Sequence, residues 1–98
     1  MEVKVINNRL VKIWTDKVEE SAMEQIANLA SLPFLFHHLA IMPDVHTGKG
    51  MPIGGVLATE GVVVPNAVGV DIGCGMCAVK TNWKVSEISQ DVLRKQIM

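Results

Sequence analysis

The chain has 98 residues, a formal net charge of −1, and 49% apolar against 19% charged residues. This composition excludes a disordered tail and gives no support for a strongly basic nucleic-acid-binding module. No apolar run approaches the roughly 18 residues of a membrane-spanning helix, and the charged N-terminus lacks a signal-peptide core. We therefore expect one small cytoplasmic domain with no membrane partner.

The first 31 residues predict a hairpin followed by a helix. Val3 and Val5 alternate with polar neighbours, Asn7-Asn8 is a turn signal, and residues 10–14 alternate again. Residues 21–24 (SAME) have the form of a capping box, in which the serine and glutamate side chains satisfy free amides at a helix start. We place the helix at residues 20–31, ending before Pro33 because a proline disfavours helical geometry in the residue preceding it.

The remainder predicts short strands joined by glycine-containing turns. Apolar, valine-rich runs at residues 53–58, 62–64, 68–72 and 76–79 are too short for helices and are typical of buried strands. Ser86 or Ser89 offers a cap for a second helix that runs to Met98 with no glycine or proline stop, which suggests a truncated chain. The fold class is therefore α+β: strands around a glycine-rich core, with one helix near 20–31 and a C-terminal helix.

The segment GVDIGCGM (residues 69–76) carries the most informative chemistry. Asp71 and Cys74 lie three residues apart among glycines, which let the backbone turn sharply or approach a ligand closely. An acid at the end of an apolar strand is costly to bury unless it is paired or binds a metal, and a bound cation holds a thiol as thiolate. A solvated aspartate in a turn beside a buried cysteine explains the same spacing without a ligand.

A second polar cluster is PDVHTGKG (residues 43–50), a glycine-containing loop after an apolar run. Asp44 and His46, two residues apart, would point to the same side of an extended chain, where one could bind a metal or orient a partner imidazole. An Asx-type turn with a surface histidine is the alternative.

Cys74 and Cys77, the two cysteines of the chain, also form a C-x-x-C pair. A redox cysteine of that kind should open a helix, whereas residues 78–81 predict a strand. A structural zinc site could combine the two thiols with two of the three histidines, His37, His38 and His46, although their spacing is unlike a zinc finger. A dinucleotide fingerprint over residues 73–78 likewise lacks its helix.

Three stretches together resemble the RtcB family of RNA ligases. They are MPDVHTGKG (residues 42–50), PIGGV (52–56) and VGVDIGCGM (68–76), in the order and separation typical of the family. Weaker similarity extends upstream to residues 12–14 and 32–34. The resemblance implies that residues 1–98 are the N-terminal portion of a longer, truncated ligase domain with an RtcB-like fold.

The resemblance further implies the activity and its cofactors. RtcB-type enzymes join an RNA 2′,3′-cyclic phosphate or 3′-phosphate to a 5′-hydroxyl, using GTP and manganese, by way of a guanylylated histidine. Their substrates are transfer RNA halves and broken RNA, and a helper protein is a candidate further partner.

Residue by residue, Asp71 matches a manganese ligand of the family and Cys74 the cysteine that bridges two manganese ions. Asp44 matches an acid that orients the nucleophilic histidine. His37, His38 and His46 match none of the family's histidines, so we expect the isolated chain to be inactive. We also expect it to self-associate, because the valine-rich strands of residues 53–79 would otherwise be left uncovered.

Overall fold

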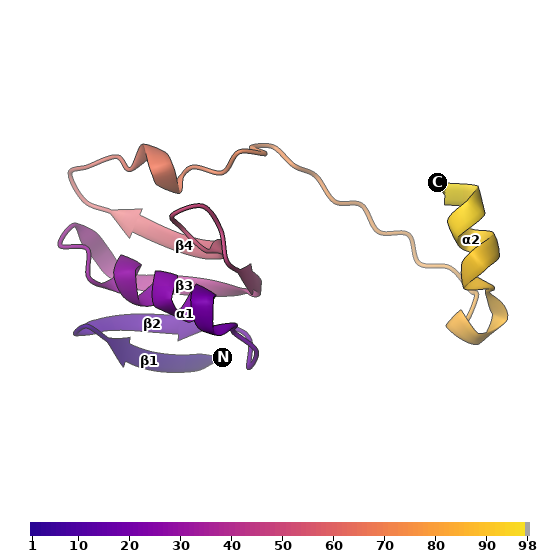
Figure 1. Ribbon diagram of the computed structural model, residues 1–98, viewed down its shortest axis with the longest axis horizontal. Coiled ribbons are helices and arrows are strands. Elements are labelled where there is room, and N and C mark those ends of the chain that lie inside the picture. The colour runs from indigo at the N-terminus through magenta and orange to yellow at the C-terminus, as the bar shows by residue number, and fades with distance from the viewer. Residues whose placement is uncertain (98) are drawn as a thin grey trace.

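The computed structural model describes residues 1–97 as one mixed four-stranded sheet with two α-helices, an α+β arrangement (Figure 1). The elements in chain order are β1 (Glu2–Ile6), β2 (Arg9–Ile13), α1 (Glu20–Ala30), β3 (Leu35–His46), β4 (Ile53–Thr59), the short 3-10 helices η1 (Pro65–Ala67) and η2 (Val85–Glu87), and α2 (Gln90–Ile97). The predicted fold class and both predicted helices are confirmed.

The hairpin of β1 and β2 is also confirmed. The strands are antiparallel, with Ile6 opposite Arg9, and the two residues between them are Asn7 and Asn8. Both asparagines have positive φ, 50° and 63°. A two-residue loop with positive φ at both positions matches the right-handed twist of paired strands, and asparagine tolerates this conformation better than most residues.

The chain then crosses from β2 through α1 to β3, which lies parallel to β2. A parallel neighbour cannot be reached by a tight turn, so the connection carries the helix that covers one face of the sheet. The core lies between this helix and the two central strands, and its buried apolar side chains are Val11, Ile13, Ala22, Ile26, Leu29, Ala30, Leu35, Leu39 and Ile41. The structure does not show the expected glycine-rich core, because all eight glycines are half-buried or exposed.

The start of α1 differs from the prediction. The N-cap residue is Glu19, and no side chain caps the helix. The Ser21 hydroxyl instead lies 2.5 Å from the Thr47 hydroxyl, beyond the end of β3. The predicted N-cap, Ser21, thus lies two residues after the observed one, inside the first turn, and its hydroxyl makes a tertiary contact.

Strand β3 runs further than the apolar run indicated, through Pro43 to His46. It pairs antiparallel with β4, and the pairing is irregular between Ile41 and His46. Proline cannot donate to a sheet ladder and is therefore found in strands at edges or bulges. The segment expected to be a loop from residue 43 thus begins as an irregular strand end.

The strands predicted at residues 62–64, 68–72 and 76–79 are wrong. In the structure, residues 68–84 form no strand and are exposed, and after a turn at residues 71–74 they run as an extended chain away from the sheet toward α2 (Figure 1). A buried strand needs neighbours on both sides to pair its backbone groups, and within residues 1–97 the sheet ends at β4. The apolar runs indicate which residues could form strands, but not that a neighbouring strand is lacking within residues 1–97.

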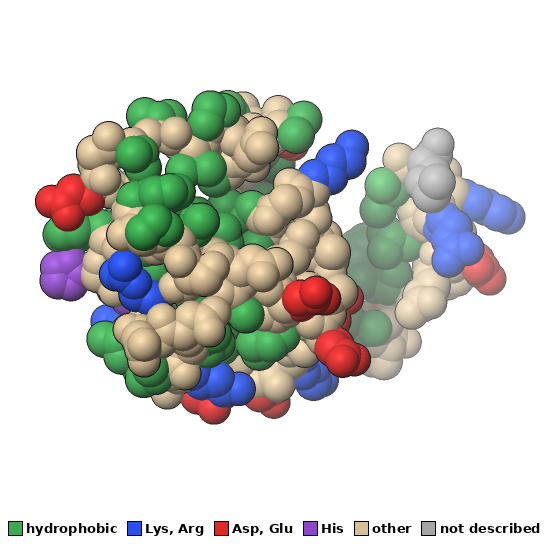
Figure 2. Space-filling view, turned by 60° about the vertical axis from the view of Figure 1, so that its left-hand side comes forward, with side chains coloured by type: hydrophobic (Ala, Val, Ile, Leu, Met, Phe, Trp, Pro, Cys, Tyr) green, Lys and Arg blue, Asp and Glu red, His purple; other side chains and the backbone are tan. Residues whose placement is uncertain are grey.

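Helix α2 begins directly after Ser89, one of the two serines proposed as its cap. Its residues are exposed, and Figure 2 shows its apolar side chains as a group apart from those spread over the sheet layer. Neither α2 nor any other helix within residues 1–97 has the length and apolar character needed to cross a membrane.

Candidate functional site

The Asp44 carboxylate is exposed and lies against the backbone of Gly54 at the start of β4. A Cβ atom added to Gly54 would stand 2.7 Å from Asp44 Oδ1 and 3.0 Å from the Val45 amide nitrogen. Gly54 also has a φ of +80°, which side chains other than glycine rarely adopt. The PIGGV segment therefore supplies the space in which Asp44 sits.

The loop that follows Asp44 is hydrogen-bonded to side chains of α1 and of its N-cap residue, Glu19. Glu19 accepts two hydrogen bonds from Thr47, one from the backbone amide and one from the hydroxyl, each at 2.6 Å. Gln25 makes two bonds with Gly48, donating from Nε2 to its carbonyl at 2.7 Å and accepting at Oε1 from its amide at 3.1 Å. With Ser21, these contacts form a clamp that fixes the path of the chain after β3.

The clamp changes the electrostatics of Glu19. The hydrogen bond from the Thr47 hydroxyl, and then that from the Thr47 amide, lower the pKa of the Glu19 carboxyl from its usual value. Desolvation opposes them by a smaller amount, and a Coulombic effect of His46, the smallest of the four, lowers the pKa slightly further. Both bonds favour the charged form, because an ionised carboxylate is the better acceptor.

His46 is turned toward its own strand. Its Nδ1 lies 2.8 Å from the backbone carbonyl oxygen of Asp44. A carbonyl only accepts, so Nδ1 carries the proton in this bond and Nε2 remains the acceptor in the neutral ring. The Asp44 carboxylate itself is not the partner of this imidazole, and within residues 1–97 it makes no ion pair.

Asp71 and Cys74 occupy the two ends of one tight turn. The Cys74 amide donates to the Asp71 carbonyl at 3.2 Å, and Gly73 between them has a φ of +83°. A positive φ at the third position of a four-residue turn selects glycine, and such a turn holds its end Cα atoms within about 7 Å. Both residues are exposed, so the carboxylate and the thiol of this one turn are each open to solvent.

The alternative zinc site is not assembled in this structure. Cys77 is exposed in the extended chain, and His37 and His38 belong to β3. Of the residues that the structure describes, no three histidine, cysteine or acidic side chains are grouped so as to hold a metal ion. His37 instead stacks edge-on against Phe36, with ring centroids 4.4 Å apart, and residues 78–81 form neither the predicted strand nor a redox helix.

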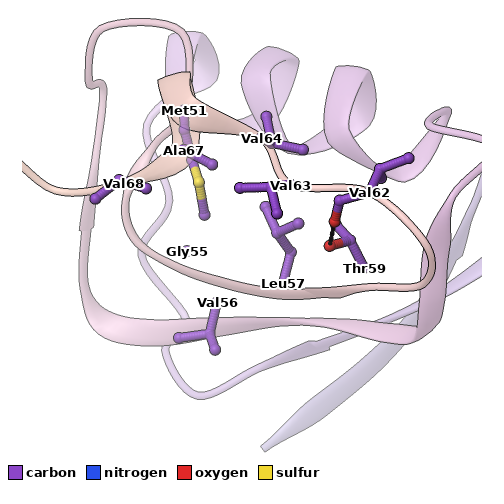
Figure 3. A pocket seen from close by; sticks show the side chains of 10 residues that line it. All are labelled: Met51, Gly55, Val56, Leu57, Thr59, Val62, Val63, Val64, Ala67 and Val68. Carbon is purple, nitrogen blue, oxygen red and sulfur yellow. Dashed lines mark hydrogen bonds between the residues drawn. The ribbon is translucent and has the colours of Figure 1, made fainter.

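A shallow apolar groove of about 360 Å³ lies between β4 and residues 62–68 (Figure 3). Thr59 is its one hydroxyl-bearing residue, and that hydroxyl donates to the Val62 carbonyl at 2.7 Å. None of Asp44, Asp71 and Cys74 lines it. The groove therefore offers packing surface, whereas the ionisable candidates lie elsewhere.

Sequence reasoning missed Glu19 and Gln25 as determinants of the site. Their partners are 23 to 28 residues away in the chain, and polar residues on a helix surface carry no signal of such a distant contact. The identified candidates Asp44, Asp71 and Cys74 are all present at turns or strand ends, but the structure does not bring Asp44 into a hydrogen bond with either of the other two within residues 1–97.

Comparison with known proteins connects these features. The family model for "tRNA-splicing ligase RtcB" matches residues 25–98, which include Asp44 and the Asp71–Cys74 turn. The RNA-splicing ligase RtcB of Escherichia coli strain K12 is 46% identical over 93 residues, covering 93% of this chain and 23% of that protein. The tRNA-splicing ligase RtcB of Archaeoglobus fulgidus is 42% identical over 86 residues, covering 85% of this chain and 17% of its own length.

No solved structure matches the chain. The chain spans about a quarter or less of the length of these curated relatives. Because the family model covers most of the chain and includes its glycine-rich turns, the chain belongs to the RtcB family of tRNA-splicing ligases.

Proposed function

We propose that this chain contributes part of the active site of an RNA ligase that joins a 2′,3′-cyclic phosphate or 3′-phosphate end to a 5′-hydroxyl end. The observation that carries the proposal is the Asp71–Cys74 turn, which presents a carboxylate and a thiol within the region matched by the family model. Transfer RNA halves and broken RNA are the proposed substrates, and the cytoplasm is the proposed location.

Asp71 and Cys74 would hold manganese. Oxygen and thiolate donors suit divalent transition metals, and both side chains are exposed at one turn, so a cation could reach them without unfolding the chain. When bound, such ions supply positive charge that stabilises transferring phosphoryl groups. Two donors leave most of a coordination shell unfilled, so we propose that other ligands come from outside residues 1–98.

Asp44 would orient the histidine that carries the guanylate derived from GTP. Asp44 is exposed, its carboxylate makes no ion pair within the described residues, and one carboxylate oxygen lies against the backbone of Gly54. A carboxylate in that position can accept the second ring N–H of an imidazole and so fix which nitrogen reacts. None of the chain's own histidines takes the nucleophile's part in this proposal.

RNA would be attracted by something other than the overall charge of the chain, which is −1. Nucleic-acid affinity rests largely on neutralising phosphates with lysine and arginine. The proposed contribution of residues 1–98 is therefore to hold metal and position groups, while most of the phosphate contacts come from elsewhere.

A chimera tests the proposal. Residues 1–98 would replace the matched segment of the Escherichia coli relative, and joining of RNA ends of the stated chemistry would be measured with GTP and manganese. The parent chimera should join RNA, Asp71→Ala and Cys74→Ser should each lower the rate by about 100-fold or more, and Cys77→Ser should leave it nearly unchanged. Equal activity in all four proteins would refute the assigned roles.

A further inference from the structure

We propose that β1 forms an interface with β1 of a second copy of this chain, paired antiparallel about a two-fold axis through Val3, to give a continuous sheet. This association is independent of the proposed ligase activity. It differs from the self-association expected of residues 53–79, because most of the strands on which that expectation depended are absent from the structure.

Of the two edges of the sheet, that of β1 is the open one. The sheet order is β1-β2-β3-β4, so β1 pairs only with β2 and β4 only with β3. Residues 62–68 run beside β4 and share a groove with it (Figure 3), whereas no described segment runs beside β1 (Figure 1). An uncovered edge leaves a row of backbone donors and acceptors free to pair with another strand.

Side chains divide between the faces of β1 in a way that suits such pairing. Glu2 and Lys4 lie opposite the buried Ile13 and Val11, so they project on the face that carries α1. They are close enough for Lys4 Nζ to lie 3.8 Å from Glu2 Oε1. Val3 and Val5 project on the other face and are 51% and 69% exposed.

The charges select one register. In a two-fold antiparallel pair centred on Val3, Glu2 of each copy stands opposite Lys4 of the other, Val3 faces Val3, and Val5 faces Met1. Shifting the centre to Glu2 or to Lys4 places like charges opposite each other, and a centre between residues places a charge opposite an apolar side chain. Opposite charges across neighbouring strands stabilise pairing, and like charges destabilise it.

The same register removes apolar surface from water. Met1 is 72% exposed in addition to the two valines, and each copy would contribute all three to the seam. Both copies would also keep α1 on the same face of the joined sheet, because the residues directly opposite each other in a ladder share a face. The second copy would therefore pair the free backbone groups of β1, place opposite charges next to each other, and cover the exposed valines.

Sedimentation equilibrium of the 98-residue chain and its charge variants tests this pairing. The unaltered chain should self-associate, and Glu2→Lys and Lys4→Glu should each weaken the association by about tenfold, since each change makes two symmetric contacts repulsive. The double variant Glu2→Lys/Lys4→Glu should associate like the original. An equimolar mixture of the two single variants should form heterodimers, because every acid then faces a base.

Restored association in the mixture would also show that both single variants fold. The proposal is overturned if the unaltered chain stays monomeric at the highest soluble concentration, if either single variant associates as strongly as the original, or if the mixture does not recover association. The last two results would place the contact on another surface, such as the groove beside β4.

Discussion

Gly54 shows how a single residue shapes the candidate site. Its positive φ and the Asp44 oxygen above it leave no space for a side chain. From the sequence, Gly54 could be recognised as part of a family motif, but its role could not be predicted. The contact between the Asp44 carboxylate and the Gly54 backbone, ten residues away, depends on the irregular pairing of β3 with β4. Residue patterns do not predict such an irregularity.

Replacing Gly54 with alanine should therefore cost more than the backbone term alone. We expect Gly54→Ala to lower the free energy of unfolding by about 2 kcal/mol or more, from left-handed strain plus the clash with Asp44. Gly61→Ala is the matched control, since Gly61 has a similar φ of +77° but nothing within 4 Å of the added atom, and it should cost about 1 kcal/mol. Equal losses in urea titrations of the two variants would contradict the contact.

The depressed pKa of Glu19 predicts a pH-dependent clamp. The folded-state pKa lies below the ordinary value of 4.5, so the charged carboxylate stabilises the fold above that pH, and this contribution is lost as the pH falls through the lower folded-state value. Glu19→Gln should therefore be less stable than the original chain at neutral pH and equally stable in acid. A stability difference that stays constant from pH 7 to about pH 3 would show that the charge plays no part.

At the scale of elements, the sequence predicted correctly those helices and strands that depend on contacts between residues close in the chain. The hairpin followed from alternation and the Asn7-Asn8 turn, and α1 followed from apolar residues at helical spacing and Pro33. The strands predicted from the valine-rich runs within residues 62–79 did not form, because a strand exists only where another strand pairs with it. Whether such a partner is present depends on distant parts of the chain, which a local pattern does not reveal. The clamp of Glu19 and Gln25 on the loop after β3 was missed for the same reason.

The β2–α1–β3 unit should account for most of the chain's stability, since the core lies there. Ile26 on α1 is fully buried against the sheet, so Ile26→Ala should cost about 2–5 kcal/mol. Ile97→Ala on α2 provides the control: Ile97 is 75% exposed, and the change should cost less than about 0.5 kcal/mol. Thermal unfolding that ranks the two variants in the reverse order would place the core elsewhere.

At the scale of the whole molecule, the chain combines a packed sheet-and-helix layer with an exposed carboxyl-terminal stretch that carries Asp71 and Cys74. The family resemblance identified the residues of the candidate site. The spacing of Asp71 and Cys74 alone fits a solvated turn as well as it fits a metal site, because two donors three residues apart also occur in turns that bind no ligand. What the structure adds is the turn geometry, the positioning of Asp44 and the clamp behind it.

This arrangement predicts that the 98-residue chain alone does not carry out the proposed chemistry. Incubation with radiolabelled GTP and manganese should leave it without covalent label, because the proposed function assigns the nucleophile's role to none of its three histidines. The Escherichia coli relative, treated in parallel, serves as the positive control. Covalent labelling of this chain that disappears when His37, His38 or His46 is replaced would identify a nucleophile that the account does not contain.

Metal binding by the Asp71–Cys74 turn is the central claim, and cobalt tests it most directly, since sulfur coordination to Co²⁺ gives a strong near-ultraviolet absorption. The two-donor site should bind weakly, so the titration extends to millimolar Co²⁺. The absorption should appear in the original chain and in Cys77→Ser, disappear in Cys74→Ser, and weaken in Asp71→Ala. Absorption that is lost in Cys77→Ser and kept in Cys74→Ser would contradict the account.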